Sequence, residues 1–267
     1  MSSEGDCRGE TRADWRDAGE KQPLTSVSTR QQHIAEMAKK YAGSPLTTLS
    51  HHMDLLWLRE AYGFRPGRSP HMALEVLRNA VMRMGGGWVL DVDIRKFFDT
   101  IPKQQLRAVL RQRIGDGVID RLIGKWLKAG IWEAGEVTYP EAGTPQGSVI
   151  SPLLSNVYLH EVLDVWFVRE IKPQLRGKTE LIRFADDFVV VCEYREDAEA
   201  LLEQVTARFQ RYGLTIHADK TRIVDFRSPW NGEHTPQTFD FLGFTHYWAK
   251  TRRGGNAVLR KTKGKKF

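Results

Sequence analysis

Two groups of aspartates interrupt apolar runs of the sequence. In "RFADDFVVV", Asp186 and Asp187 are adjacent and have apolar residues on both sides. In "WVLDVDI", Asp91 and Asp93 are two residues apart, so a strand would direct both side chains to one face. Carboxylates grouped in this way suit Mg²⁺, which binds through a few carboxylates and through substrate phosphates. The residues therefore indicate phosphoryl transfer assisted by two metal ions.

The elements that must hold these carboxylates are short strands. The runs Leu181 to Phe184 and Phe188 to Cys192 predict a hairpin whose turn carries "ADD", and Trp88 to Ile94 predicts a further strand. If the strands are neighbours, three carboxylates converge. A lone aspartate pair in a turn is usually only a solvated turn. A functional interpretation of the pair therefore depends on the other motifs in the sequence.

Helices and strands interleave without strict alternation, which favours an α+β fold over a doubly wound sheet. Helices are expected from Pro70, over residues 101–114, from Asn156 to Ile171 and from Asp197 to Tyr212. The sequence predicts four regions: a disordered tail (1–28), a helical N-terminal segment (29–61), the main α+β body (62–250) and a basic C-terminal tail (251–267).

Composition limits the classes of protein to which this sequence can belong. The 267 residues carry a formal charge of +7, which suits an anionic partner such as nucleic acid. The two cysteines, Cys7 and Cys192, are far apart, so a disulfide framework or a cysteine zinc site is not expected. We find neither a signal peptide nor an apolar run long enough to cross a bilayer. We therefore expect a cytoplasmic protein without a membrane partner.

The order of five segments carries a specific resemblance. "DIRKFFD", "GTPQGSVISPLLSN", "FADD", "HADKT" and "FLGF" follow one another in the chain. In this respect the sequence resembles the reverse transcriptases, or maturases, encoded by bacterial group II introns, over roughly residues 62–250. The resemblance implies a palm whose antiparallel sheet packs on helices. It also implies an RNA-directed DNA polymerase that uses Mg²⁺, an RNA template such as the intron RNA, a DNA primer and deoxynucleoside triphosphates.

The resemblance assigns the metal ligands. It implies that Asp93, Asp186 and Asp187 hold the metal ions, with Asp186 as the direct ligand in the "ADD" turn and Asp187 beside it. Phe184 stands where the family has tyrosine, which keeps the aromatic ring and loses a hydroxyl group. The adjacent charges would then be tolerated because Mg²⁺ and phosphates neutralise them.

The resemblance also assigns residues to the nucleotide. Phe98 would lie under the sugar, where a ring disfavours a 2′-hydroxyl group. Gln146 would hydrogen-bond the incoming nucleotide, and Gly147 would allow close backbone approach. Lys220 in "HADKT" would donate a proton to the pyrophosphate leaving group or stabilise its charge; a solvated lysine is the alternative. Arg65 in "GFRPGR" is a further candidate, should this loop fold over the site.

Two segments are candidates for contact with the nucleic-acid chain. Phe241, Leu242 and Gly243 resemble the primer-grip hairpin, although the same alternation would suit a plain core strand. Residues 251–267 are rich in Lys, Arg and Gly, a composition that can follow a phosphate backbone; the alternative is a disordered, solubilising end.

The sequence departs from the family in two places. No segment between Arg59 and Arg65 resembles the fingers region, and the sequence stops at "RKTKGKKF", where a thumb would begin. These departures predict a truncated form with poor polymerase activity. A non-catalytic RNA-binding remnant is the alternative. Another two-metal palm enzyme, such as a nucleotide cyclase, is less well supported because "PQG" and "FLGF" are typical of polymerases that read a template.

Overall fold

The structure is a computed structural model, and its described part leaves gaps in the chain. Side chains are described throughout this part except at 131–133 and 136–138. The described residues are 61–65, 67–112, 114, 117–128, 131–133, 136–138, 151–229 and 235–264. The helices expected between residues 29 and 61, and the loop with Gln146 and Gly147, lie outside it. Within the described part, no helix is both long and apolar enough to span a membrane.

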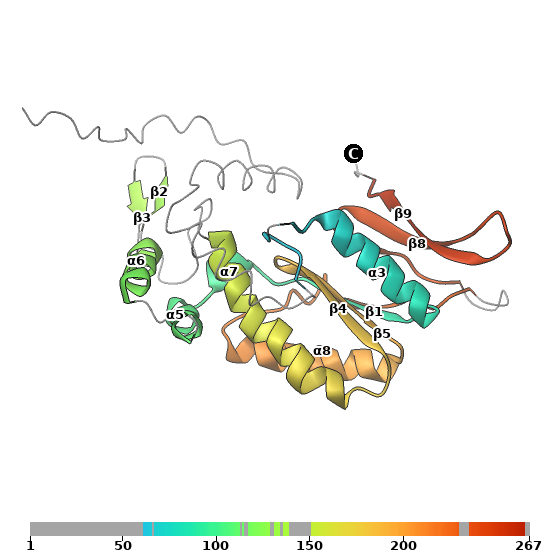
Figure 1. Ribbon diagram of the computed structural model, residues 1–267, viewed down its shortest axis with the longest axis horizontal. Helices are drawn as coiled ribbons and strands as arrows, with labels where there is room; N and C mark the ends of the chain where they lie inside the picture. The colour runs from blue at the N-terminus through green and yellow to red at the C-terminus, as the bar shows by residue number, and fades with distance from the viewer. Residues whose placement is uncertain are drawn as a thin grey trace, which may run out of the picture.

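A four-stranded antiparallel sheet forms the middle layer of the molecule (Figure 1). Its strand order is β4-β5-β1-β6. The strands are β1 (Trp88–Val92), β4 (Thr179–Phe184), β5 (Asp187–Cys192) and β6 (Arg222–Asp225). The strand and the hairpin predicted around the aspartates are thus confirmed. Strand β1 pairs with β5, so the condition for the carboxylates to converge, that these strands are neighbours, is met.

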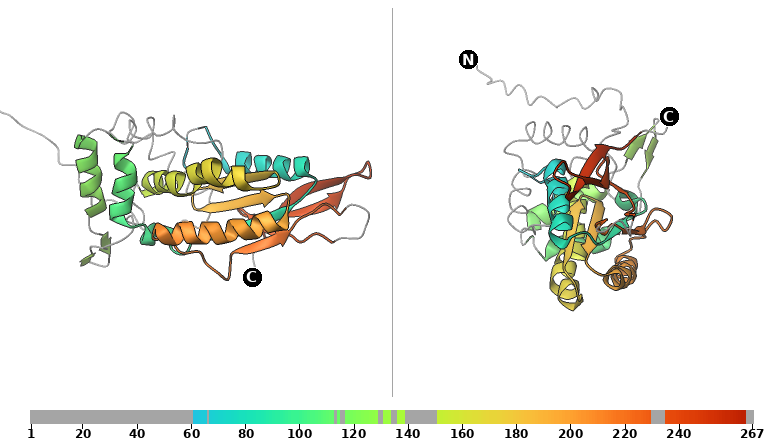
Figure 2. Two further views of the ribbon diagram at one scale, coloured as in Figure 1. Left: turned by 90° about the horizontal axis from the view of Figure 1, so that it is seen from below. Right: turned by 90° about the vertical axis from the view of Figure 1, so that its right-hand side faces the viewer.

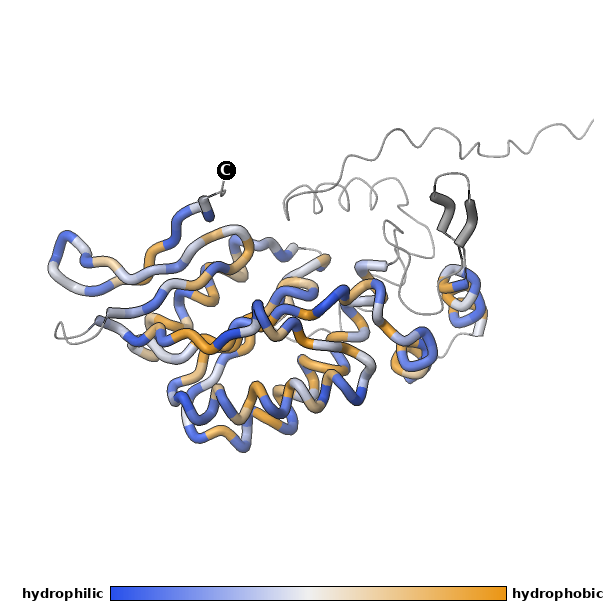
Figure 3. Tube along the Cα trace, turned by 180° about the vertical axis from the view of Figure 1, so that it is seen from behind, coloured by the Kyte–Doolittle hydropathy of each residue, from blue (hydrophilic) through white to orange (hydrophobic). Residues whose placement is uncertain are grey.

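Alternate side chains of the central strands enter two separate cores. Leu90 and Val190 pack into one core, whereas Val89 and Val191 pack into the other. This alternation follows from the two-residue period of a strand, and it requires apolar residues at successive positions because both faces are covered. Figure 3 shows hydrophobic segments gathered along these central strands.

Helices cover the first face of the sheet. They comprise α4 (Phe97–Thr100), α5 (Lys103–Arg111), α6 (Gly117–Lys128), α7 (Ser151–Leu159), the π-helical segments η1 (His160–Val165) and η2 (Phe167–Ile171), the short 3₁₀ turn η3 (Lys172–Gln174) and α8 (Arg195–Arg211). Figure 2 shows α8 running beside the strands. A small ribbon of β2 (Ile131–Glu133) and β3 (Glu136–Thr138) follows α6.

The second face is covered by α3 (Pro70–Met84) and by a three-stranded antiparallel sheet. The helix begins as predicted, because the Ser69 side chain accepts a hydrogen bond from the Met72 backbone N–H and Pro70 fits the first turn. The small sheet contains β7 (Phe239–Phe241), β8 (Phe244–Lys250) and β9 (Asn256–Thr262).

Strand β9 lies inside the segment expected to be a basic tail. It pairs with β8 along seven residues, and the Arg78 side chain of α3 donates a hydrogen bond to the Val258 carbonyl oxygen at 3.2 Å. Ala257 and Val258 are buried, whereas Leu259 to Thr262 are exposed. Residues 256–262 are therefore an ordered part of the fold that carries its basic side chains on the surface.

Candidate active site

The turn between β4 and β5 presents the aspartate pair. Phe184 pairs with Asp187 across the hairpin, so Ala185 and Asp186 form its two-residue turn. Ala185 has a positive φ of 58°, which is uncommon for a residue other than glycine. Asp187 is exposed and Asp186 is half-buried.

Asp93 follows β1 at the same end of the sheet. The last ladder pair between the strands joins Val92 to Phe188, so Asp93 and Asp187 each lie one residue beyond it. The backbone of Asp93 is fixed on its other side by "HADKT": its carbonyl oxygen accepts from the His217 N–H at 2.8 Å, and its N–H donates to Thr221 Oγ1 at 3.3 Å. The motif therefore holds Asp93 in place.

Asp93 and Asp187 line one cleft of about 420 Å³. The residues of "FLGF" that resemble the primer grip line it too, as does Lys220. The complete lining is Asp91, Val92, Asp93, Asp187, Phe188, Asp219, Lys220, Arg222, Asp240, Phe241, Leu242, Gly243 and Lys263. Four of the predicted motifs thus contribute to a single cleft, which makes it the candidate active site.

Each of three basic side chains in the cleft pairs with a carboxylate. Lys220 Nζ lies 3.1 Å from Asp93 Oδ2, and Arg222 Nε lies 3.4 Å from Asp91 Oδ2. Burial raises the pKa of Asp91, and the nearby Arg222 only partly offsets this effect. Five aspartates face three basic residues, so the cleft keeps an excess of negative charge that favours a cation.

Asp240 on β7 was not singled out from the sequence. Its carboxylate accepts from Thr245 Oγ1 at 2.5 Å and lies 3.0 Å from Lys263 Nζ. Burial alone would raise the pKa of Asp240, but these two partners hold it below its usual value. The position within "FDFLGF" was the available signal, because Asp240 precedes the turn that enters the cleft.

Not every predicted residue meets in the cleft. Asp186 is not among the lining residues, and the described residues contain no group of three or more His, Cys, Asp or Glu side chains arranged to hold a metal ion. The convergence of all three carboxylates therefore stays a prediction. Phe98 is half-buried in α4 and contacts the Phe97 ring at a centroid distance of 5.3 Å. Arg65 donates to the Ala61 carbonyl oxygen.

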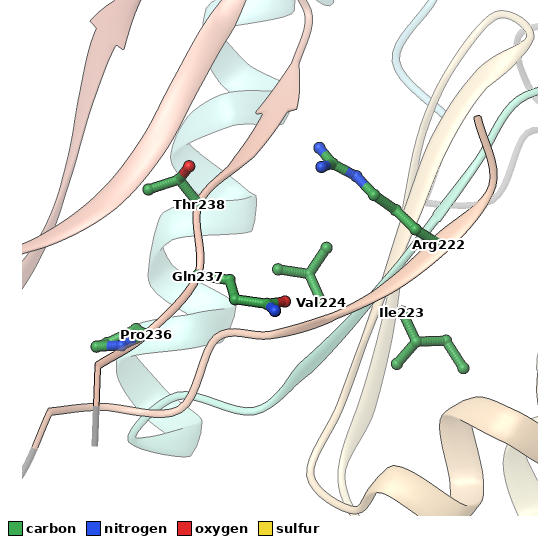
Figure 4. A pocket seen from close by; sticks show the side chains of 6 residues that line it. All are labelled: Arg222, Ile223, Val224, Pro236, Gln237 and Thr238. Carbon is green, nitrogen blue, oxygen red and sulfur yellow. The ribbon is translucent and has the colours of Figure 1, made fainter. Parts of the chain in front are cut away.

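A larger hollow of about 620 Å³ lies on the outer side of β6 (Figure 4). The figure shows Arg222 and Gln237 on its opposite sides, with Val224 between them. The other lining residues are Ile223, Pro236 and Thr238. Since no carboxylate is among these lining residues, we assign the chemistry to the smaller cleft.

Comparison with known proteins decides the family. Residues 29–246 match the sequence profile of the family described as reverse transcriptase (RNA-dependent DNA polymerase). The chain belongs to this family. The match covers most of the chain and contains each of the five motifs.

Group II intron-encoded proteins are among the relatives. The chain is 36% identical over 177 residues to group II intron-encoded protein LtrA of Lactococcus lactis subsp. cremoris, covering 62% of this chain and 29% of that protein. It is 31% identical over 242 residues to protein YkfC of Escherichia coli K12, covering 78% of this chain and 61% of YkfC. The chain therefore spans from under a third to about three fifths of these relatives.

Solved structures support the fold. The apo telomerase of Candida tropicalis superposes with a TM-score of 0.60 at 13% identity, over 82% of this chain and 40% of that chain. The predicted α+β reverse transcriptase palm, with an antiparallel sheet packed on helices, is thus confirmed.

Proposed function

We propose that this chain carries the catalytic palm of an RNA-directed DNA polymerase of the group II intron type. The observation that carries the proposal is the shared cleft: Asp93 and Asp187 line it together with Lys220 and the "FLGF" turn. The five aspartates of the lining supply hard oxygen donors, and a few carboxylates with substrate phosphates suffice for Mg²⁺. The donor set therefore suits the metal that the family implies.

Different residues of the cleft would have different roles in nucleotidyl transfer. Asp93 and Asp187, with Asp186 from the turn, would hold Mg²⁺, which when bound activates the primer 3′-hydroxyl group and stabilises charge on the phosphates. Phe241, Leu242 and Gly243 would position the primer end. Lys220 would supply a proton or positive charge to the departing pyrophosphate.

Primer extension tests the proposal. The purified chain, an RNA template, an annealed DNA primer and the four deoxynucleoside triphosphates are incubated with Mg²⁺. We expect slow primer elongation, in line with the poor activity predicted from the sequence, that follows the template sequence and is lost when EDTA is added. Template binding without elongation would favour the alternative of a non-catalytic RNA-binding remnant. Conversion of a single nucleoside triphosphate without a template would favour a cyclase-type reaction.

Lys220 gives a second prediction, because it pairs with a proposed metal ligand. In Lys220→Met, the ammonium group no longer neutralises Asp93. We expect Mn²⁺, used as a spectroscopic substitute for Mg²⁺, to bind a few-fold tighter, since an exposed ion pair contributes at most about 1 kcal/mol. Extension should slow by at least about 100-fold if Lys220 is the proton donor.

Electron paramagnetic resonance titration of Mn²⁺ measures the first effect, and single-turnover extension measures the second. Lys178→Met, at an exposed position before β4, is the matched control and should change neither quantity. Weaker Mn²⁺ binding in Lys220→Met would contradict the competition between ammonium and metal.

The β8–β9 hairpin gives a third prediction. Arg252 and Arg253 are exposed at its tip, which Figure 3 shows as hydrophilic. We expect RNA affinity to fall steeply with salt, and the double variant Arg252→Gln/Arg253→Gln to reduce the slope of log K against log[salt] by about 1.4 if both contact phosphates of a single strand. Fluorescence anisotropy over a salt series measures this slope.

Point variants replace deletion of residues 251–267, because deletion would remove β9 from its sheet. The matched control is Arg121→Gln/Lys125→Gln, which removes the same charge from exposed positions of α6 at the other end of the molecule (Figure 1). Equal slopes for the hairpin variant and the wild type would show that the tip does not touch RNA.

A further inference from the structure

A fully buried arginine stands two residues before the "ADD" turn. Arg183 on β4 is 0% exposed. Its Nε and Nη2 donate to the two carboxylate oxygens of Asp164 at 2.7 and 2.5 Å, which is a bidentate pair. Its remaining nitrogen, Nη1, donates to Asn156 Oδ1 at 2.6 Å and to the Ala185 carbonyl oxygen at 2.8 Å. One side chain thus joins two helical segments to the turn.

The bond to Ala185 fixes a conformation that the chain would otherwise disfavour. Ala185 has a φ of 58°, in the left-handed region where a Cβ atom is unfavourable. Its carbonyl group belongs to the peptide unit that leads into Asp186. A donor aimed at this oxygen therefore holds the peptide plane that sets the direction of the two aspartates.

The same network fixes the segment beneath the turn. Asn156 Nδ2 donates to the Gly63 carbonyl oxygen at 2.7 Å, and the Tyr62 N–H donates to the Arg183 carbonyl oxygen at 2.8 Å. A Cβ atom on Gly63 would lie only 2.3 Å from the Ala185 nitrogen, so the two backbones are in direct contact. The turn is thus held from both sides.

The helical partners have a geometry suited to this task. Asp164 lies in the π-helical segment η1, directly after α7 with Asn156. Departures from α-helical to π-helical turns within a helix are frequent at functional sites. His160, one turn before, lies 3.4 Å from Asp164 through Nδ1 and completes the polar cluster.

We propose that Arg183 is a positioning residue, which orients the "ADD" turn through the Ala185 carbonyl group and takes its own orientation from Asp164 and Asn156. Its effect on catalysis rests on the proposed polymerase function, whereas its effect on the turn does not. The metal-binding carboxylates are then aimed by a buried guanidinium group rather than by the turn sequence alone.

The test compares two variants of the whole chain with one control. Arg183→Lys keeps a positive charge for Asp164 but cannot donate to Asn156 and Ala185 in the same fork geometry. Asn156→Ala keeps the Arg183–Asp164 pair and removes one of the two acceptors for Arg183 Nη1, together with the hydrogen bond from Asn156 Nδ2 to the Gly63 carbonyl oxygen. Ser155→Ala is the control, because its buried hydroxyl oxygen has no hydrogen-bond partner among the described residues.

Hydrogen exchange of the turn is the deciding measurement. We expect backbone amides of residues 184–187 to exchange at least tenfold faster in both variants, with unchanged exchange in β1 as the internal reference, and no change in Ser155→Ala. A purely structural role would instead accelerate exchange in β1 as well. Unchanged exchange at 184–187 would overturn the proposal, and Asn156→Ala decides it if Arg183→Lys fails to fold.

Primer extension is measured in parallel to keep the two proposals apart. If the wild type extends primers, the variants should lower kcat for deoxynucleotide addition with little change in KM, because the turn aims the metal ligands and does not bind the base. If the wild type does not extend primers, the polymerase proposal fails, and the exchange data still decide the role of Arg183.

Discussion

Replacing Asp93 by Asn is expected to lower template-directed primer extension by about 1000-fold or more, with the fold intact. The carboxylate lies in the cleft with Asp187, and losing one preorganised charged group in an active site typically removes a factor of this order. Single-turnover incorporation of one deoxynucleotide measures the loss. The fold should remain because Asp93 is only partly buried and asparagine has nearly the same shape.

Replacing Asp186 or Asp187 of the turn by Asn tests which of the two aspartates holds the metal. The resemblance to the family assigned direct ligation to Asp186, whereas Asp187 is the one that lines the cleft. We expect the Asp186→Asn variant to lose activity as severely as Asp93→Asn if the turn rotates on binding substrate, and less severely if it does not. Mn²⁺ affinity measured on both turn variants separates these outcomes.

A charge-matched control guards against a general effect of lost negative charge. Glu203→Gln removes an exposed carboxylate from α8, among the helices that cover the sheet, and should keep full activity. Extension by Asp93→Asn at the wild-type rate would refute the assignment of the site. A parallel loss in Glu203→Gln would show that net charge, and not the cleft, governs the assay.

Three strands of the central sheet, β1, β4 and β5, were predictable because each is a largely apolar run with β-branched or aromatic side chains, bounded by charged or turn residues. Strand β6 was not predicted, because it has only four residues and only Val224 among them is buried. The predicted helix from Asp197 to Tyr212 matches α8 to within two residues at its start and one at its end. Local periodicity sufficed in these cases.

Two further features were not predicted from the sequence. Strand β9 was hidden by basic residues, since only Ala257 and Val258 of its seven residues are buried. The predicted helix from Asn156 to Ile171 begins earlier, at Ser151, and becomes π-helical at His160. Apolar spacing did not reveal this change of turn.

The Arg183 network shows the same limit of sequence-based prediction at the candidate site. An arginine beside an apolar run was visible, but its partners Asp164 and Asn156 lie 19 and 27 residues earlier and belong to two other elements, η1 and α7. The motifs therefore indicate which groups could do chemistry. The structure adds which buried groups hold them in position.

Breaking the Arg183–Asp164 pair is expected to have the largest effect on stability. Asp164→Leu leaves a guanidinium group buried with no carboxylate beside it, which costs about 3–5 kcal/mol. For a chain of this size the thermal midpoint should fall by roughly 10 °C. Arg195→Leu, which breaks the exposed pair with Glu199, is the control and should cost about 1 kcal/mol or less.

The pH dependence of the loss follows from Asp164. Burial alone would raise the pKa of its carboxyl group, but the Arg183 guanidinium group holds this pKa below its usual value. A lowered folded-state pKa contributes stability above the unfolded-state pKa, and this contribution is lost as the pH falls through the folded-state value. The difference between wild type and Asp164→Leu should therefore be full near neutral pH and shrink under acid conditions.

The double variant Asp164→Leu/Arg183→Met separates stability from positioning. Replacing a buried ion pair by apolar side chains of similar volume is often neutral, so unfolding by urea should show most of the 3–5 kcal/mol recovered, to within about 1 kcal/mol. The Ala185 carbonyl group would still lack its donor, so exchange at the turn should stay fast and extension should stay slow. If the double variant regained both stability and wild-type extension, the buried arginine would serve the fold alone, because an apolar core in its place would then orient the aspartates equally well.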